Sequence, residues 1–374
     1  MNLPSLGRAL CGIVAALALL QQPTRAETPA CVAPLLAYAG TEGAGLHALR
    51  VCDGALQDLG AVADVARPRW LLAHGATLYV ASDPAGAEGQ VLAFGIDRAS
   101  AALQPLNAVG SGGAGATHLA LDAASQTLLA ANFSAGSVAS FAVEDDGRVG
   151  ARVSLLQAMG SGPHKRQASA HAHGAAFDPT GRFVLVPDLG ADRVFVYGFD
   201  RTRHALQADP PRALALPPGS GPRRAVFGRD GRHVHVLNEL SAEIVTLGWT
   251  AGARLAPQQT LALNGEGFQG TRSASELLLS ADGRFAYAAD RGEGALRVYG
   301  IDADSGRLSP LQSLPSGGDA PWALAIDASG RWLLVANLRS RRIHLFRIDP
   351  ASGRLSDTGQ SVEMPGPLSL AFVN

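Results

Sequence analysis

The fold is decided by a stretch that occurs twice near the middle of the chain: residues 173–188 read HGAAFDPTGRFVLVPD, and residues 223–238 read RRAVFGRDGRHVHVLN. Each copy has a short apolar strand, a turn containing Gly, and a second apolar strand ending in Asp or Asn. Residues 275–290 and 322–337 repeat the pattern, and residues 118–132 repeat it with one residue fewer. Alternating β-branched and aromatic residues bounded by Gly and Asp are typical of hairpins. The stretch therefore predicts paired antiparallel strands at regular intervals.

The repeat also sets the number of units. Alternating third strands follow at 194–199, 296–301 and 343–348. The residues that end the second strands serve as anchors, and they are Gly40, Ser82, Asn132, Asp188, Asn238, Asp290 and Asn337. Because their spacing stays near 50 residues throughout, seven β-rich units fill the chain after its first residues.

The two ends of the repeated region complement each other. Residues 35–39 form a second strand with no first strand before it, and residues 367–373 form a first strand with no second strand after it. Pairing the two closes a ring and removes exposed sheet edges. The sequence therefore predicts an all-β fold: a single seven-bladed β-propeller over residues 27–374, with four-stranded antiparallel blades closed by the N- and C-terminal strands. An open β-solenoid is the alternative, although its repeats are usually shorter.

The N-terminus has the pattern of a signal peptide. Arg8 precedes an apolar run at residues 9–20, and the polar residues 21–26 end in the small residue Ala26. That run is shorter than the roughly 20 residues that span a membrane. We expect cleavage after residue 26, a periplasmic or secreted protein, and no membrane attachment once the peptide is removed. An uncleaved N-terminal anchor is the alternative.

Composition narrows the partners. Charged residues make up 17% of the chain, and 31 basic residues nearly balance 32 acidic ones. Without a basic cluster, the sequence does not predict nucleic-acid binding. Cys31 and Cys52 can pair as a disulfide in an exported protein, with two separate buried thiols as the alternative. No second Cys pair or Cys-His spacing indicates zinc. A closed ring needs no partner subunit, so we expect a monomer.

Topology brings polar residues of the blades to one mouth of the ring. In an antiparallel blade, the start of the first strand and the end of the second lie at the same edge. The first-strand starts are His118, His173, Arg223, Ser275, Glu276 and Trp322. The second-strand ends, with the residues that follow two of them, are Asn132, Asp188, Asn238, Glu239, Asp290, Arg291 and Asn337. Small polar residues at strand ends often only satisfy turn backbone, which is the simplest interpretation of Asn132, Asp290 and Asn337.

Two further interpretations of this mouth stay open. Arg223, Arg291, Glu239 and Glu276 can form a purely structural ring of ion pairs, because buried charges require partners. His171 and His173 lie on one strand face and can bind a metal, but spacing marks no third ligand.

The motifs resemble a known family. In chain order they are Gln167 with His171-Ala-His173, Gly221-Pro222-Arg223, Asn238-Glu239-Leu240, Ala274-Ser275-Glu276 and Asp290-Arg291-Gly292. This ordered set resembles the lactonase-type seven-bladed propellers, which include 6-phosphogluconolactonases and carboxymuconate cyclases. The resemblance implies a catalytic cluster of His173, Arg223, Glu239 and Arg291, with no metal and no cofactor. We expect substrate contacts from Gln167, His171, Asp188, Asn238, Glu276, His118 and Trp322. Two departures, Ala170 for a common Pro and Arg224 for a common His, can alter substrate choice.

The chemistry of these residues suits lactone hydrolysis. The reaction needs an activated water, a stabilised oxyanion and a proton for the leaving alkoxide. Arg223 and Arg291 can hold substrate oxygens, and either His173 or Glu239 can act as the base. The chain has no Gly-x-Ser-x-Gly nucleophile motif. We therefore predict an exported, metal-independent hydrolase of a sugar lactone or related small-molecule lactone. The alternatives are a non-catalytic propeller that binds a ligand or protein partner at its top face and a muconate-type lactonising cycloisomerase.

Overall fold

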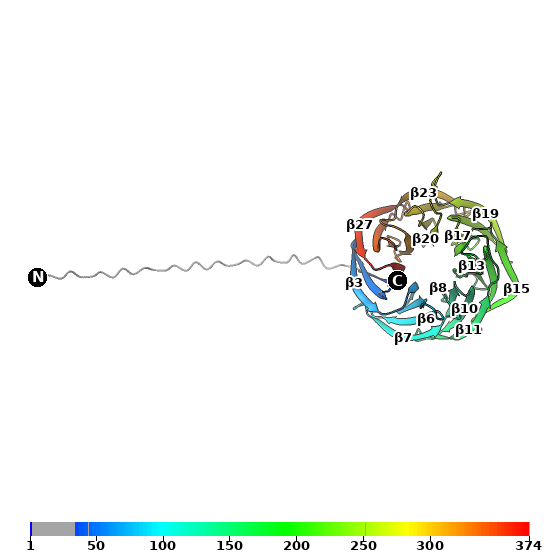
Figure 1. Ribbon diagram of the computed structural model, residues 1–374, viewed down its shortest axis with the longest axis horizontal. Coiled ribbons are helices and arrows are strands. Elements are labelled where there is room, and N and C mark those ends of the chain that lie inside the picture. The colour runs from blue at the N-terminus through cyan, green and yellow to red at the C-terminus, as the bar shows by residue number, and fades with distance from the viewer. Residues whose placement is uncertain (2–33, 44, 251, 374) are drawn as a thin grey trace. The chain divides into compact units, whose positions relative to one another are not determined.

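The computed structural model describes residues 1, 34–43, 45–250 and 252–373, and these residues form 28 strands and no helix. The strands make seven four-stranded antiparallel sheets. The sheets stand around a central axis like the blades of a propeller (Figure 1). The predicted all-β, seven-bladed architecture is confirmed, and the open solenoid is excluded.

Each blade runs from an innermost to an outermost strand, and we number the blades in chain order. Blade 1 consists of β28 (Pro367–Phe372), β1 (Leu35–Thr41), β2 (Leu46–Cys52) and β3 (Ala55–Ala63). Blade 2 consists of β4 (Pro68–His74), β5 (Thr77–Ser82), β6 (Gln90–Ile96) and β7 (Leu103–Gly110). Blade 3 consists of β8 (Ala116–Asp122), β9 (Thr127–Asn132), β10 (Ser137–Val143) and β11 (Val149–Gln157).

The remaining four blades follow the same order. Blade 4 consists of β12 (Ala176–Phe177), β13 (Phe183–Asp188), β14 (Arg193–Asp200) and β15 (Ala205–Ala215). Blade 5 consists of β16 (Pro222–Phe227), β17 (His233–Asn238), β18 (Glu243–Trp249) and β19 (Leu255–Ala262). Blade 6 consists of β20 (Ala274–Leu279), β21 (Phe285–Asp290), β22 (Ala295–Ile301) and β23 (Leu308–Pro315). Blade 7 consists of β24 (Pro321–Ile326), β25 (Trp332–Asn337), β26 (Arg342–Ile348) and β27 (Leu355–Glu363).

The ring closes where the sequence predicts. β28 pairs antiparallel with β1, and Phe372 and Leu370 lie opposite Ala37 and Ala39. The second strands end at the predicted anchors in six blades, whereas β1 ends at Thr41, one residue after Gly40. The first blade is therefore built from both ends of the propeller chain.

Aspartate side chains fix the recurring turn between first and second strands. In blade 4, Asp178 Oδ1 accepts hydrogen bonds from the backbone N–H groups of Arg182 (2.8 Å) and Phe183 (2.7 Å). In blade 7, Asp327 makes the same pair of bonds to Arg331 and Trp332. Such side-chain bonds stabilise a tight turn and set the register of the hairpin. The repeated Asp thus has a structural role.

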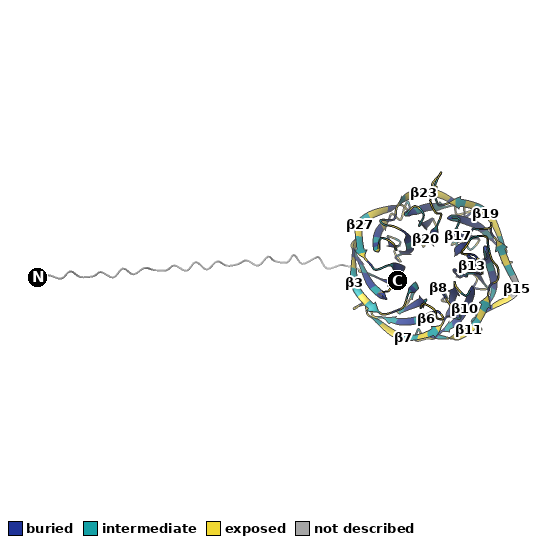
Figure 2. Ribbon diagram, viewed as in Figure 1, coloured by how far each residue is buried: buried dark blue, intermediate teal, exposed yellow. Residues whose placement is uncertain are grey.

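The core lies between neighbouring blades. Inner and middle strands are buried, while the outermost strands alternate between covered and exposed residues (Figure 2). Leu119 and Leu128 of blade 3, for example, pack with Tyr79 and Val91 of blade 2. Burying a large apolar side chain stabilises a fold by about 1.5–3 kcal/mol. The blades are therefore held by apolar contacts with both neighbours, which leaves the axial end of the first strands available for polar residues.

Some expectations lie outside the described part. Residues 2–33 belong there, and with them the body of the expected signal peptide and Cys31. Cys52 ends β2, and its pairing with Cys31 stays a prediction. Within the described ranges, no helix is long and apolar enough to cross a membrane.

Candidate active site

One backbone irregularity recurs near the start of the innermost strands. In β4 the pairing jumps from Pro68 to Trp70, and in β16 it jumps from Pro222 to Arg224, so Arg69 and Arg223 are bulged out of the ladder. Bulges re-aim a side chain away from the normal face of a sheet. The bulged residues of blades 1, 2, 3, 5, 6 and 7 are Leu368, Arg69, Thr117, Arg223, Ser275 and Trp322.

His173 has the corresponding place in blade 4. The preceding residue, Ala172, forms a bridge with Asp188, and the His173 N–H donates to the carbonyl of Pro187 (3.0 Å). The seven equivalent positions therefore carry seven side chains around one mouth of the ring.

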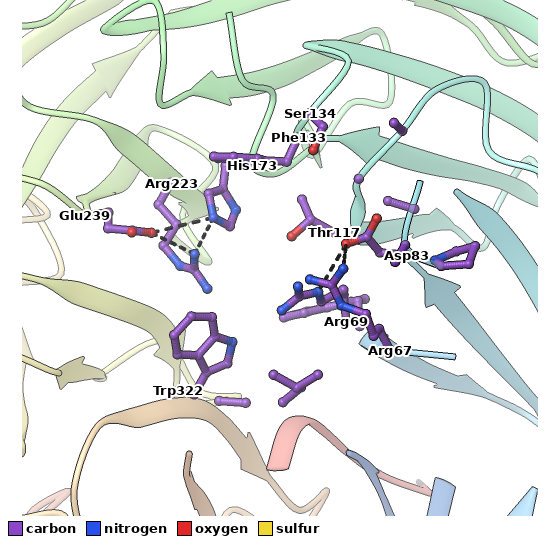
Figure 3. A pocket seen from close by; sticks show the side chains of 18 of the residues that line it. Arg67, Arg69, Asp83, Thr117, Phe133, Ser134, His173, Arg223, Glu239 and Trp322 are labelled. Atoms are coloured by element: carbon purple, nitrogen blue, oxygen red, sulfur yellow. Dashed lines mark hydrogen bonds and ion pairs between the residues drawn. The ribbon is translucent and has the colours of Figure 1, made fainter. Parts of the chain in front are cut away.

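These positions enclose a cavity of about 830 Å³. Six of the seven residues at the bulge positions line it, and they are Leu368, Arg69, Thr117, His173, Arg223 and Trp322. Figure 3 shows His173, Arg223 and Glu239 on one side of the cavity and Arg67, Arg69 and Asp83 on the other. Ser275 is absent from the wall because its groups are used elsewhere: its hydroxyl donates to the carbonyl of Pro321 (2.6 Å).

Glu239 is the centre of a buried cluster. It follows β17 and is 2% exposed. Its Oε1 lies 2.8 Å from Arg291 Nη2 and 2.5 Å from Arg166 Nη1, and its Oε2 lies 2.8 Å from Arg223 Nη1. His173 Nε2 lies 3.6 Å from Oε2. The structure thus brings together all four residues of the expected catalytic cluster and adds Arg166.

The charges decide the state of Glu239. Burial opposes ionisation, but the guanidinium groups of Arg291 and Arg223 outweigh it and hold the pKa of Glu239 well below its usual range. An ionised carboxylate whose two oxygens already bind three arginines is a poor proton acceptor. Its geometry suits a second role, which is to orient the arginines around it.

His173 has the opposite character. Burial, reinforced by the charge of Arg223, lowers the pKa of His173 well below 6.5, so the imidazole is neutral at pH 7. Its Nε2 accepts a hydrogen bond from Arg223 Nη1, which places the ring proton on Nδ1. Phe133 meets the ring edge-on, with centroids 5.1 Å apart. His173 is therefore a fixed, unprotonated base at the cavity wall.

Arg223 is held on several sides. Its Nε donates to the carbonyl of Ser275, and its Nη1 donates to His173 and Glu239. Burial lowers the pKa of Arg223 to about 10, which leaves it charged at neutral pH. Trp322 supports both this group and Arg291, whose guanidinium lies 4.5 Å from the ring centroid. These contacts do not use Nη2 of Arg223, so Nη2 can donate a hydrogen bond to an oxygen atom of a ligand in the cavity.

A second buried ion pair lies in the same wall. Arg224 binds Glu276 with two parallel hydrogen bonds of 2.7 Å and lies 4.1 Å over the ring of Trp70. Both charged side chains are more than 90% buried. This pairing satisfies Nε and Nη2 of Arg224 and both carboxylate oxygens of Glu276, which is consistent with a structural ion pair; contact of Glu276 with substrate stays a prediction.

The remaining expected residues lie around the cavity without lining it. His118 is turned away because the bulge places Thr117 in the wall; its ring contacts Trp70 at 4.5 Å, and its Nδ1 accepts from Ala175 N–H. His171 stacks on Phe133 at 4.5 Å. Their contact with substrate stays a prediction.

Three further expected residues have backbone or loop partners. Gln167 Nε2 donates to the Leu189 carbonyl and to Asp192, and Asp188 accepts from the N–H groups of His171 and Ala191. Asn238 is fully buried, and its side-chain amide has no hydrogen-bond partner among the described residues. A direct role in substrate binding for these three also stays a prediction.

Sequence reasoning missed Arg166 and the whole contribution of blade 2. Arg166 lies in the long connection between β11 and β12, which no repeat covers. The turn after β4 lacks the Asp of the other blades, so residues 68–74 escape the repeat. The similarity of Pro68-Arg69-Trp70 to Pro222-Arg223-Arg224 is the sequence feature that could have identified the contribution of blade 2.

A metal centre finds no support in the donor pattern. Among the described residues, no three His, Cys, Asp or Glu side chains converge as a possible metal site. His171 and His173, the pair that suggested one, are engaged with Phe133 and with Arg223. Independence from metal stays a prediction for experiment.

Comparisons with known proteins agree with the fold and the motifs. The family described as Lactonase, 7-bladed beta-propeller matches residues 35–372. A 6-phosphogluconolactonase of Bacillus subtilis is 28% identical over 338 residues, covering 90% of this chain and 95% of that protein. A 6-phosphogluconolactonase of Formosa agariphila is 29% identical over 67% of this chain and 71% of its own length. The solved structure of the periplasmic gluconolactonase PpgL of Pseudomonas aeruginosa has a sequence 32% identical to this chain; the match covers 91% of this chain and 99% of that one, with a TM-score of 0.85.

Proposed function

Because the chain belongs to the lactonase family of seven-bladed β-propellers, we propose that it hydrolyses a sugar lactone or a related lactone, without a metal and outside the cytoplasm. The observation that carries the proposal is a neutral, buried His173 held against Arg223 in the cavity wall. The relatives support it, since they are named for a phosphorylated and an unphosphorylated gluconolactone. The signal-like N-terminus and the periplasmic relative support export.

Substrate binding uses the free face of Arg223. The lactone carbonyl oxygen accepts a hydrogen bond from Nη2, the nitrogen left open by the contacts of Nε and Nη1. A guanidinium near this oxygen stabilises the negative charge that develops when the carbonyl carbon becomes tetrahedral. The scheme requires the hydrogen bond from Arg223 Nη1 to His173 Nε2 to break when substrate binds, so that the Nε2 lone pair can accept a proton.

His173 then acts as the general base. Its imidazole takes a proton from water as the water oxygen bonds to the carbonyl carbon. The ring C–O bond then breaks, and the imidazolium returns the proton to the leaving alkoxide oxygen. The product is an open-chain hydroxy acid, which loses its own proton to solvent. The low pKa of Glu239 and its arginine partners favour His173 over Glu239 as the base.

Glu239 and Arg291 are positioning residues in this scheme. Glu239 holds the arginines of blades 5 and 6 in place, and Arg291 is further held by the Ala274 carbonyl at 2.9 Å. Arg166 approaches the same carboxylate from a more exposed position, with 43% of its side chain accessible. Three guanidinium groups on one carboxylate leave a net positive charge, which attracts the oxyanion and the carboxylate product.

The test is hydrolysis of glucono-δ-lactone followed by pH-stat, corrected for the spontaneous reaction. We expect His173→Asn to lower kcat by about 100-fold or more, because general acid–base groups contribute that much. Its melting temperature should change little, since both side chains are neutral. His74→Asn, at an exposed histidine that ends β4, is the matched control.

Two outcomes contradict the proposal. Unchanged turnover in His173→Asn would remove the base, and wild-type protein that binds lactones without opening them would favour a non-catalytic propeller. A chelator should leave the rate unchanged, and loss of activity with chelator would overturn the metal-free mechanism.

A further inference from the structure

Blade 2 carries two arginines at the cavity wall, and one of them, Arg69, repeats the position of the candidate catalytic residues. Arg69 has the bulge position that His173 has in blade 4 and Arg223 in blade 5. In a ring of seven blades, blade 2 lies across the axis from blades 5 and 6 (Figure 1). Arg69 therefore faces the reaction centre from the opposite wall, as Figure 3 shows.

Arg67 has an unusual backbone conformation. Its φ of +43° is left-handed, as it is for the residue before the first strand in four other blades, which is glycine in three of them (Gly115, Gly221 and Gly366) and Ala320 in blade 7. A side chain in this region strains the backbone. Replacing the usual glycine places a long cationic side chain at the cavity wall.

The two arginines share a loosely held carboxylate, Asp83, and the charge of Glu42 also acts on Arg69. Arg67 Nη1 and Arg69 Nε each lie 3.5 Å from the same oxygen, Asp83 Oδ2, which is longer than the 2.7–2.9 Å of a charge-assisted hydrogen bond. Both guanidinium groups are partly buried, and neither makes a hydrogen bond of ordinary charge-assisted length with Asp83. Their donors are therefore free to bind an anion more closely than they bind Asp83.

A buried donor without a partner lies close by. Trp70, the residue after Arg69, supports the guanidinium of Arg224 at 4.1 Å. Nη1 of Arg224 is buried and has no hydrogen-bond partner among the described residues, although Arg224 lines the cavity. An unsatisfied buried N–H of a charged group is expensive, so Nη1 would gain from any acceptor that comes within hydrogen-bond distance.

We propose that Arg67 and Arg69 form a second anion subsite that binds a carboxylate or phosphate carried by the lactone away from its ester bond. This inference rests on the proposed function. It assigns the two arginines as specificity-determining residues: the wall of blades 4 and 5 acts on the ester, while blade 2 selects lactones with a remote negative charge. The cavity of about 830 Å³ is large enough for both subsites to be occupied together.

The test compares kcat/KM for three lactones: uncharged glucono-δ-lactone, its 6-phosphate, and a glucarolactone with a free carboxylate. Hydrogen bonds to charged groups contribute enough to change affinity by about tenfold to 100-fold. We expect Arg69→Gln to lower kcat/KM for the phosphate or the carboxylate lactone by that factor, through KM, and to change the uncharged lactone less than threefold. Arg148→Gln, at an exposed arginine paired with Asp146, is the control.

Arg67→Gly separates selectivity from folding. It removes the cation and the left-handed strain together, so the melting temperature should hold or rise while the preference for a charged lactone falls. A lower melting temperature with unchanged selectivity would assign Arg67 a structural role and overturn the proposal. The proposal is also overturned if Arg69→Gln affects charged and uncharged lactones equally, or if the wild-type protein rejects both charged lactones.

A binding experiment keeps the subsite testable apart from turnover. Inorganic phosphate is titrated calorimetrically into wild-type protein and Arg69→Gln. Binding that is lost in the variant supports the subsite even if no lactone is hydrolysed, in which case the proposed function fails alone. Equal binding by both proteins overturns the subsite and leaves the proposed function standing.

Discussion

Removal of β28 should destroy the propeller, although it takes only the last residues of the chain. A protein ending at Gly366 loses the innermost strand of blade 1. Leu368, Leu370, Phe372 and Val373 are each less than 9% exposed. At about 1.5–3 kcal/mol for each buried side chain, their loss costs about 6–12 kcal/mol, which is comparable with the 5–15 kcal/mol stability of a typical domain.

The loss affects both neighbours of blade 1. Leu370 and Phe372 pack into a cluster with blade 7, whereas Ala371 and Val373 pack into a cluster with blade 2. Ser369 also donates a hydrogen bond of 2.7 Å to the carbonyl of Pro68 in blade 2. The strand therefore seals the ring on two sides, and its removal exposes the edge of β1.

The assay is expression of the truncated chain, with solubility, limited proteolysis and thermal unfolding as readouts. We expect insoluble or protease-sensitive protein, whereas a chain ending at Val373 should behave like the full-length protein. A synthetic peptide of residues 367–374 added during refolding should restore part of the soluble fraction. A soluble truncation at Gly366 with an unchanged melting temperature would refute the argument that this strand seals the ring.

Two further predictions concern buried charge in blades 5 and 6. Arg224→Met or Glu276→Met alone should lower the free energy of unfolding by about 3–5 kcal/mol, because each leaves a buried charge unpaired. The double variant should recover most of that loss, as measured by urea unfolding. Equal losses in all three variants would contradict this prediction. Burial lowers the pKa of His235 to about 4. As pH drops, this histidine is therefore protonated in the unfolded chain at a higher pH than in the folded protein. The folded protein should lose stability between about pH 6.5 and about pH 4. His235→Leu introduces the residue found at the equivalent position in blade 4, Leu185. The variant should lose less stability on acidification than the wild type, by at most about 3 kcal/mol. The same dependence of stability on pH in wild type and variant would contradict this prediction.

The architecture could be predicted because the same physical requirement recurs in every blade. Each middle strand is covered on both faces, so its residues are apolar, and the hairpin turns need residues such as Asp178 or Gly181. Repetition makes these requirements visible in one sequence. Blade 2 was the exception, because β4 and β5 are joined by a loop of only two residues, Gly75 and Ala76, which contains no Asp.

The site could be predicted only in part, because function depends on the positions that do not repeat. Strand-end topology and the family resemblance identified His173, Arg223, Glu239 and Arg291. They left the protonation states open, since these depend on burial and on charges from other blades. Arg166 could not be found, because its contact with Glu239 spans 73 residues and belongs to an irregular loop.

The bulge explains why a nearly symmetric ring has an asymmetric site. A bulged residue is released from the ladder, so its side chain is free of the apolar pattern that the blade requires. Blade 1 has Leu368 there and blade 3 has Thr117, while blades 4 and 5 have His173 and Arg223. Substitution at such a position changes the cavity while leaving the apolar contacts between blades intact. A scaffold built in this way can change its substrate through the bulged residues alone, which is why Arg69, at the same position in blade 2, is the residue we expect to set the preference of this protein for a charged lactone.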